Sequence, residues 1–362
     1  SRAVNGAIVV TTKSGRGSKG KSSGFQVTYN FGYSQDKVLR LPEFQNKYGQ
    51  GYTGDDPATG NGFMEADESW GAPLDGRPYI NYKGESKSWS PQPDNIKDFF
   101  VKGSQLDNAL SIASADEKGA VRLSLSSFNQ KGTVPNTAFN KYTAGISINR
   151  QLTERLSVDG SVNFTSGQGK NRPGVGYDTY NPLQSLFGWF GRQVDMNELK
   201  NTYNDIDPST GLHYTWNHYH NNPYWTLYNN LNTDKRDRVI ASAQFKYKLT
   251  SWLSASVRGG ADSYTEKRFQ KFKNGTVDYA YMQKGGFYDD NAKKSVSNID
   301  AMLVANKRFQ DKFSITGTLG YNFYRNVFER NQTEVRGLIV PDLYNVSFAT
   351  NQPIVTNLIQ KK

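Results

Sequence analysis

Aromatic rings and hydrogen-bonding side chains gather in two short stretches, and these residues are the best suited to bind a ligand. The first stretch contains Trp189 and Phe190, and the second covers residues 216–225. Exposed aromatic planes beside Asn and His donors could recognise a sugar or a peptide. The favoured alternative is that these rings pack the loops onto the rest of the protein or lie at an interface. The candidate binding residues are Trp189, Phe190, Trp216, His218, Tyr224 and Trp225.

Metal binding is the second chemistry to consider. His218 and His220 lie two residues apart, which on a strand would place both imidazoles on one face for a transition metal. No Cys and no carboxylate cluster lies near them, so a hydrogen-bonding role in a loop is favoured. Segments 55–60 and 205–211 share an Asp-Pro-x-Thr-Gly core that could bind Ca²⁺. That order is also ordinary turn chemistry, so we expect no metal and no cofactor.

Other function classes are disfavoured. All three His lie in one loop, so no Ser-His-Asp arrangement can be argued, and we expect no enzyme. The absence of Cys excludes disulfides and thiolate metal sites. The formal net charge of +11 raises nucleic acid as a partner, but the Lys and Arg residues are dispersed. Because no nucleic-acid-binding module is present either, we expect no nucleic acid partner.

The rest of the chain indicates what must position these loops. From Gly24 to Ser34, apolar and polar residues alternate strictly, as in a strand whose two faces meet different solvents. Mean hydropathy is −0.72 and no run of about 18 apolar residues occurs, so no transmembrane helix is expected. None of the 13 prolines interrupts the alternating segments, which supports an all-β fold. These nine segments are 24–34, 110–112, 121–125, 142–148, 156–164, 239–249, 253–261, 299–305 and 313–323.

The connections and the charges favour a membrane barrel over a soluble sandwich. Short turns alternate with long segments, which is typical of an antiparallel outer-membrane β-barrel. The turns within 150–157, 247–254 and 307–314 also resemble one another. Long extracellular loops are expected at about 35–106, 166–236, 265–295 and 325–362. The charged residues expected on the polar, lumen-lining face are Arg122, Asp159, Arg238, Lys246, Arg258, Asp262 and Asp300.

Four sequence blocks carry a resemblance to a known family. They are residues 2–13 (Arg-Ala-Val-Asn-Gly-Ala-Ile-Val-Val-Thr-Thr-Lys), residues 69–76 (Ser-Trp-Gly-Ala-Pro-Leu-Asp-Gly), residues 98–112 and residues 129–136. In this order they resemble the SusC/RagA family, the TonB-dependent outer-membrane transporters of Bacteroidetes. The first block resembles the last strand of that family's plug domain, and the second resembles a motif of its first external loop.

The resemblance implies an architecture and a set of partners. It implies the end of a plug domain at 1–15, a linker at 16–24 and the N-terminal part of a barrel of about 22 strands at 25–362. We therefore expect an internal fragment whose remaining strands follow residue 362. The implied partners are a SusD-like surface lipoprotein, the TonB–ExbB–ExbD system and the lipid and lipopolysaccharide (LPS) of the membrane. The implied location is the outer membrane of a Gram-negative bacterium of the Bacteroidetes.

Two functions follow as hypotheses. The first is TonB-dependent uptake of oligosaccharides or peptides by the SusC-like barrel of a SusCD-type complex. The second is a SusC-like barrel kept as a structural scaffold in a larger outer-membrane assembly. A passive porin is disfavoured, because porins lack the plug strand that residues 7–13 resemble.

Overall fold

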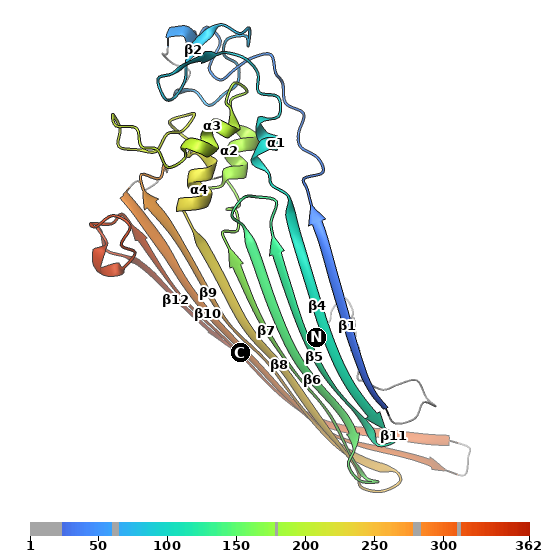
Figure 1. Cartoon of the computed structure of the whole chain (residues 1–362). Coiled ribbons are helices and arrows are strands. Elements are labelled where there is room, and N and C mark those ends of the chain that lie inside the picture. The colour runs from blue at the N-terminus through green and yellow to red at the C-terminus, as the bar shows by residue number, and fades with distance from the viewer. Residues whose placement is uncertain (1–23, 60–64, 178–179, 278–283, 310–312) are drawn as a thin grey trace.

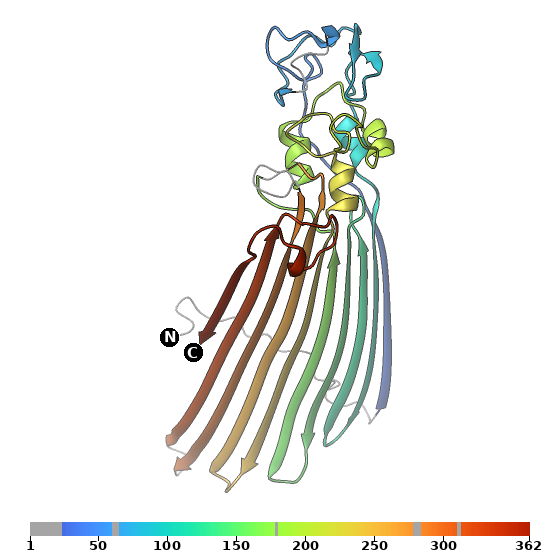
Figure 2. The ribbon, with the colours of Figure 1, turned by 90° about the vertical axis from the view of Figure 1, so that its left-hand side faces the viewer.

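The computed structural model describes residues 24–59, 65–177, 180–277, 284–309 and 313–362. The expected plug strand at 1–15, linker residues 16–23 and the expected turn at 310–312 lie outside the described residues. Ten strands form one antiparallel sheet, which curves as it runs from β1 to β12 (Figures 1 and 2). The large sheet comprises β1 (Gly24–Asp36), β4 (Gly103–Asp116), β5 (Gly119–Lys131), β6 (Ala138–Gln151), β7 (Leu156–Lys170), β8 (Asn232–Lys248), β9 (Leu253–Asn274), β10 (Lys284–Phe309), β11 (Phe313–Arg336) and β12 (Ile354–Lys361).

Smaller elements lie in the long connections. The first long loop (residues 37–102) contains η1 (Pro57–Thr59), the hairpin of β2 (Pro78–Ile80) and β3 (Ser86–Ser88), and α1 (Asn95–Phe99). The second long loop (residues 171–231) contains α2 (Pro182–Gly188), α3 (Met196–Thr202) and α4 (Pro223–Asn229), and η3 (Val346–Phe348) precedes β12. Both long loops lie at the same end of the sheet (Figure 1). No described helix is long and apolar enough to cross a membrane.

The register of the sheet separates an apolar face from a polar face. Cross-strand partners share a face, and one row on the apolar face runs through Val27, Ile112, Leu123, Ile146 and Val162. Side chains on this face are exposed, Phe25 to 72% and Leu319 to 71%, because none of the other described segments covers them. The predicted all-β, two-faced antiparallel sheet is thus confirmed.

The apolar face has the height of a membrane. At β8 it extends from Val239 to Leu249, the first residue after the strand. A rise of about 3.4 Å per residue makes this run about 34 Å long. A strand tilt of about 40° reduces its height to roughly 26 Å, close to the apolar band of outer-membrane barrels.

The repeated turn sequences fold alike. In the turn between β6 and β7, Leu152 N donates to Leu156 O, and Thr153 Oγ1 accepts from Leu156 N at 3.0 Å. In the turn between β8 and β9, Thr250 Oγ1 accepts from Leu253 N at 3.0 Å. The threonine hydroxyl satisfies backbone N–H groups that would otherwise have no partner at the end of the ladder, which explains the recurring Leu-Thr-x-x-Leu.

The structure changes the expected extent of two loops and the number of strands. Most of the expected loop at 265–295 is paired strand, because β9 continues to Asn274 and β10 starts at Lys284. The expected loop at 325–362 contains the rest of β11 and a tenth strand, β12. The alternating pattern fails there because the face that is apolar further down the strands becomes polar above the apolar band, for example at the paired Lys267 and Asn291. The strand ends around the other two expected loops, 35–106 and 166–236, lie close to the expected bounds.

Candidate functional site

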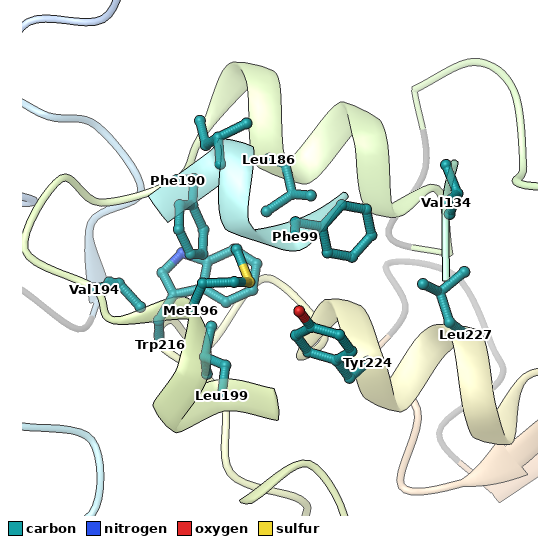
Figure 3. Close-up of a cluster of buried hydrophobic side chains, with 11 residues drawn as sticks. Phe99, Val134, Leu186, Phe190, Val194, Met196, Leu199, Trp216, Tyr224 and Leu227 are labelled. Carbon is teal, nitrogen blue, oxygen red and sulfur yellow. The ribbon is translucent and has the colours of Figure 1, made fainter. Parts of the chain in front are cut away.

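The two long loops share one hydrophobic core. Phe99 of α1, Leu186 of α2, Leu199 of α3 and Tyr224 of α4 all contribute to it and are at most 2% exposed (Figure 3). The helices that supply these residues start in a recurring way. At α2 and α4 an Asn caps the helix and a Pro follows at the first helical position. The cap oxygen satisfies free N–H groups and the proline fixes the helical φ angle.

The structure places four of the six predicted binding residues inside the loops. Phe190 and Trp216 meet edge to face, with ring centroids 4.8 Å apart. Tyr224 and Trp225 are each 2% exposed, and the ring of Trp225 stacks on that of His213 with centroids 4.2 Å apart. Their burial agrees with the alternative that these rings pack the loops. Trp189 is half-buried and His218 is exposed, so these two remain accessible.

His220 joins both long loops through a buried relay. Its Nδ1 lies 3.0 Å from Ser185 Oγ, and its Nε2 lies 3.0 Å from Asp67 Oδ2. Burial lowers the pKa of His220, although the Asp67 carboxylate opposes this. The arrangement has the composition of a hydrolytic triad, which the sequence did not predict because the three residues lie far apart. Ser185 and His220 are each 1% exposed, so a substrate cannot reach the hydroxyl.

Paired carboxamides also connect the loops. Gln50 N donates to Gln193 Oε1 at 3.1 Å, and Gln193 Nε2 donates back to Gln50 Oε1 at 3.2 Å. Asn217 Nδ2 donates to Ala66 O at 2.8 Å. Gln50 and Asn217 are fully buried, so these bonds are shielded from water.

Arg192 of the second long loop is a buried cation held entirely by neutral acceptors of the first. Its guanidinium donates to Gln45 O, Gln92 O and Pro93 O and to the side-chain oxygens of Asn46 and Asn95. Arg192 is 3% exposed, and burial lowers its pKa. Among the described residues, no carboxylate forms an ion pair with it. It therefore acts as a rigid multidentate donor between the loops.

An open pocket lies on the outer part of the first long loop. It measures about 610 Å³ and is lined by Tyr48, Asp55, Asp56, Trp70 and Arg77, among others. Trp70 is 65% exposed, and its ring lies 6.4 Å from that of Tyr48. An exposed indole beside carboxylates is suited to bind a sugar ring or a peptide side chain. Sequence reasoning placed Trp70 in a family motif and gave it no binding role.

The charges beside this pocket are fixed by Arg77. Its guanidinium donates three hydrogen bonds to the Asp75 carboxylate, and hydrogen bonding to Arg77 lowers the pKa of Asp75 to about 2. Arg77 Nη1 also lies 3.8 Å from Asp56 Oδ1. Two carboxylates therefore lie beside this one guanidinium, and Asp55 lines the same pocket, so these four side chains together carry net negative charge.

The two Asp-Pro segments form turns. Asp207 Oδ1 accepts from Ser209 N at 2.8 Å and from Ser209 Oγ at 2.7 Å, and these bonds lower the Asp207 pKa. Asp55 Oδ2 accepts from Tyr52 N at 2.6 Å. In the part of the chain that the structure describes, no three His, Cys, Asp or Glu side chains gather as metal ligands. Gly60, the last residue of the first segment, lies outside that part.

The polar face of the sheet carries cross-strand ion pairs. Arg238 of β8 binds Asp262 of β9 through two bonds of 2.7 and 2.5 Å. One strand further, Arg258 donates to Asp300 at 2.9 Å. The register places on this face all seven residues predicted for it: Arg122, Asp159, Arg238, Lys246, Arg258, Asp262 and Asp300.

Comparison with known proteins identifies a relative of this chain in sequence. No family profile matches the chain. A TonB-dependent receptor, P26 of Formosa agariphila, is 27% identical over 290 residues, covering 79% of this chain and 26% of the receptor. The chain thus spans about a quarter of that relative's length.

Solved structures agree on the fold. The RagAB peptide importer in its "closed-closed" state matches the whole chain with a TM-score of 0.69 and 12% identity, and the chain covers 41% of it. The "open-open" state matches 94% of the chain with a TM-score of 0.65, also at 12% identity, with 39% of that structure covered. The chain is thus similar in sequence to a TonB-dependent receptor and in fold to the RagAB peptide importer, and its antiparallel sheet agrees with the SusC/RagA-type barrel that its sequence blocks predict.

Proposed function

We propose that the whole protein imports small organic nutrients, either oligosaccharides or peptides, across the outer membrane of a Gram-negative bacterium of the Bacteroidetes. The observation that carries this proposal is the two-faced sheet. One face is an apolar band of membrane height, and the other bears the ion pairs of Arg238 and Arg258. A wall of this kind separates lipid from a polar interior through which a hydrophilic solute can pass. The seven charged residues of the polar face would then line the transit path.

The pocket at Trp70 is the proposed first contact for the substrate. Trp70 would stack on a sugar ring or on a side chain of a peptide, while Asp55 and Asp56 would accept its hydroxyl or amino hydrogens. The accessible His218 and the half-buried Trp189 are further candidate contacts.

Partners follow from the same proposal. A SusD-like lipoprotein would cover the end of the barrel that carries the long loops, and the TonB–ExbB–ExbD system would supply energy from the periplasm. The solved RagAB structures are of a peptide importer in "closed-closed" and "open-open" states, which supports a lid that opens and closes.

Uptake by cells that carry the full-length protein tests the proposal. Labelled oligosaccharides and labelled peptides are offered separately, with and without a functional TonB. Uptake of one class should be lost when the gene or TonB is deleted. Uptake that persists without TonB would contradict active import, and no uptake of either class would favour the scaffold hypothesis.

The Trp70→Ala variant tests the pocket. Loss of a stacked indole should weaken binding by about 1.5 kcal/mol, which raises the apparent KM of uptake about tenfold. Tyr228→Ala is the control, because Tyr228 is a partly exposed ring on α4 outside the pocket, and its KM should not change. An unchanged KM for Trp70→Ala at normal surface abundance would remove the pocket from substrate capture.

A further inference from the structure

A continuous row of carboxamides and lysines crosses the sheet on its apolar face, and at its centre, on β8, it lies just above the apolar band. The register aligns its members on the apolar face, from β5 across to β12. On β8 the row lies four residues beyond Val239, about 10 Å nearer the end of the sheet that carries the helices. The row comprises Asn129, Asn140, Gln168, Lys235, Lys267, Asn291, Asn331 and Asn357.

The centre of this row places two like charges opposite each other. Lys235 of β8 and Lys267 of β9 are direct cross-strand partners, and both are exposed. Side chains at directly opposed positions start about 5 Å apart, and like charges there are destabilising. An anion held between the two ammonium groups would remove this repulsion.

The neighbouring acids neutralise these lysines only in part, because Asp237 pairs with Lys235 and no acid pairs with Lys267 within the described residues. Asp237 Oδ2 lies 3.3 Å from Lys235 Nζ, and Asp237 Oδ1 also accepts a hydrogen bond from Ser166 Oγ. Asp289 Oδ1 accepts a hydrogen bond from Asn291 Nδ2. Glu329 lies one row lower, opposite Lys293. Within the described residues no ion pair forms at three exposed lysines on this face, which are Lys131, Lys170 and Lys267. The patch around Lys235 and Lys267 is therefore cationic.

We propose that this row binds the phosphorylated saccharide headgroup of an outer-leaflet glycolipid. Lys235 and Lys267 would clamp a phosphate group, with Lys170 supplying further positive charge. The carboxamides on either side, Gln168 and Asn140, would donate to and accept from sugar hydroxyls. The acyl chains would lie along the apolar face below, around Val239. The inference rests on the proposed outer-membrane location.

Binding to the purified full-length receptor tests this site without requiring transport. Native mass spectrometry in detergent compares bisphosphorylated lipid A, dephosphorylated lipid A and phosphatidylglycerol. We expect the phosphorylated glycolipid to bind in preference to both others. The K235Q/K267Q variant should bind it roughly twentyfold to thirtyfold more weakly, about fivefold for each lysine.

Matched variants separate the site from general charge. K97Q/K200Q removes two exposed lysines of the long loops and should bind like the wild type, and K235R/K267R should retain binding. The heat-modifiable gel shift verifies that each variant has folded. Equal binding of dephosphorylated lipid A or of phosphatidylglycerol would overturn the proposal, as would unchanged binding by K235Q/K267Q or an equal loss in K97Q/K200Q. Because no step measures uptake, failure here is distinct from failure of the import function.

Discussion

Replacing Arg192 with alanine should separate the two long loops while leaving the sheet intact. The guanidinium donates to five acceptors in residues 45–95. A buried acceptor that loses its donor costs about 1–3 kcal/mol. Water will reach part of the emptied site, so we expect the local unfolding free energy to fall by about 3–5 kcal/mol.

Hydrogen exchange measured by mass spectrometry on the full-length protein can detect this change. A loss of about 3–5 kcal/mol makes protected amides in the loop core exchange about 150-fold to 5,000-fold faster. The amides of α1 and α2 should show the effect, whereas those of β5 and β6 should not. The exchange rates in Arg192→Lys should lie between those of Arg192→Ala and the wild type, because an ammonium group cannot reproduce the planar fork of the guanidinium.

Arg172→Ala is the matched control. Arg172 has a 56% exposed side chain and pairs with Asp234 at 2.8 Å, so its loss should cost below about 1 kcal/mol. Acceleration below tenfold in Arg192→Ala, or equal acceleration in Arg172→Ala, would refute the argument that Arg192 holds the loops together.

Two further predictions concern the loop core and the membrane face. Burial lowers the pKa of His213 to about 3, so the stability that it contributes is complete above about pH 6.5 and falls as the pH drops towards 3. The acid transition followed by tryptophan fluorescence should therefore move to lower pH in His213→Phe, and an unmoved transition would argue against the neutral His. Phe245→Arg places a charge within the apolar band and should destabilise the barrel by about 2–4 kcal/mol in urea titrations. Gln244→Arg points to the polar face and should cost little, so equal losses in the two variants would contradict the assignment of the faces.

The sequence predicts the sheet well where its two faces differ in chemistry. The alternation of apolar Phe25, Val27 and Tyr29 with polar residues predicts β1, because lipid favours apolar side chains on one face only. The signal disappears where strands rise above the membrane, since Lys267 and Asn291 then differ little from their neighbours. The sequence pattern does not predict β12 either, because its residues Ile354–Lys361 do not alternate strictly.

The loop site was less predictable, because the sequence does not distinguish a buried aromatic residue from an exposed one. Trp216 fills a core and Trp70 lies at the surface, and only the folded loops distinguish them. The link between His220 and Asp67 spans 153 residues, so no local spacing could reveal it. Its only sequence signal is a His within a cluster of aromatic residues.

The shared core of the two long loops limits how this barrel can diversify. Gln50 and Gln193 bond to each other, and Arg192 fits acceptors that lie 97 to 147 residues earlier in the chain. A loop transplanted alone from a relative would bring one half of these matched contacts and leave buried polar groups without partners. Loop exchange, by recombination or by engineering, should therefore succeed only when residues 37–102 and 171–231 are moved as a pair.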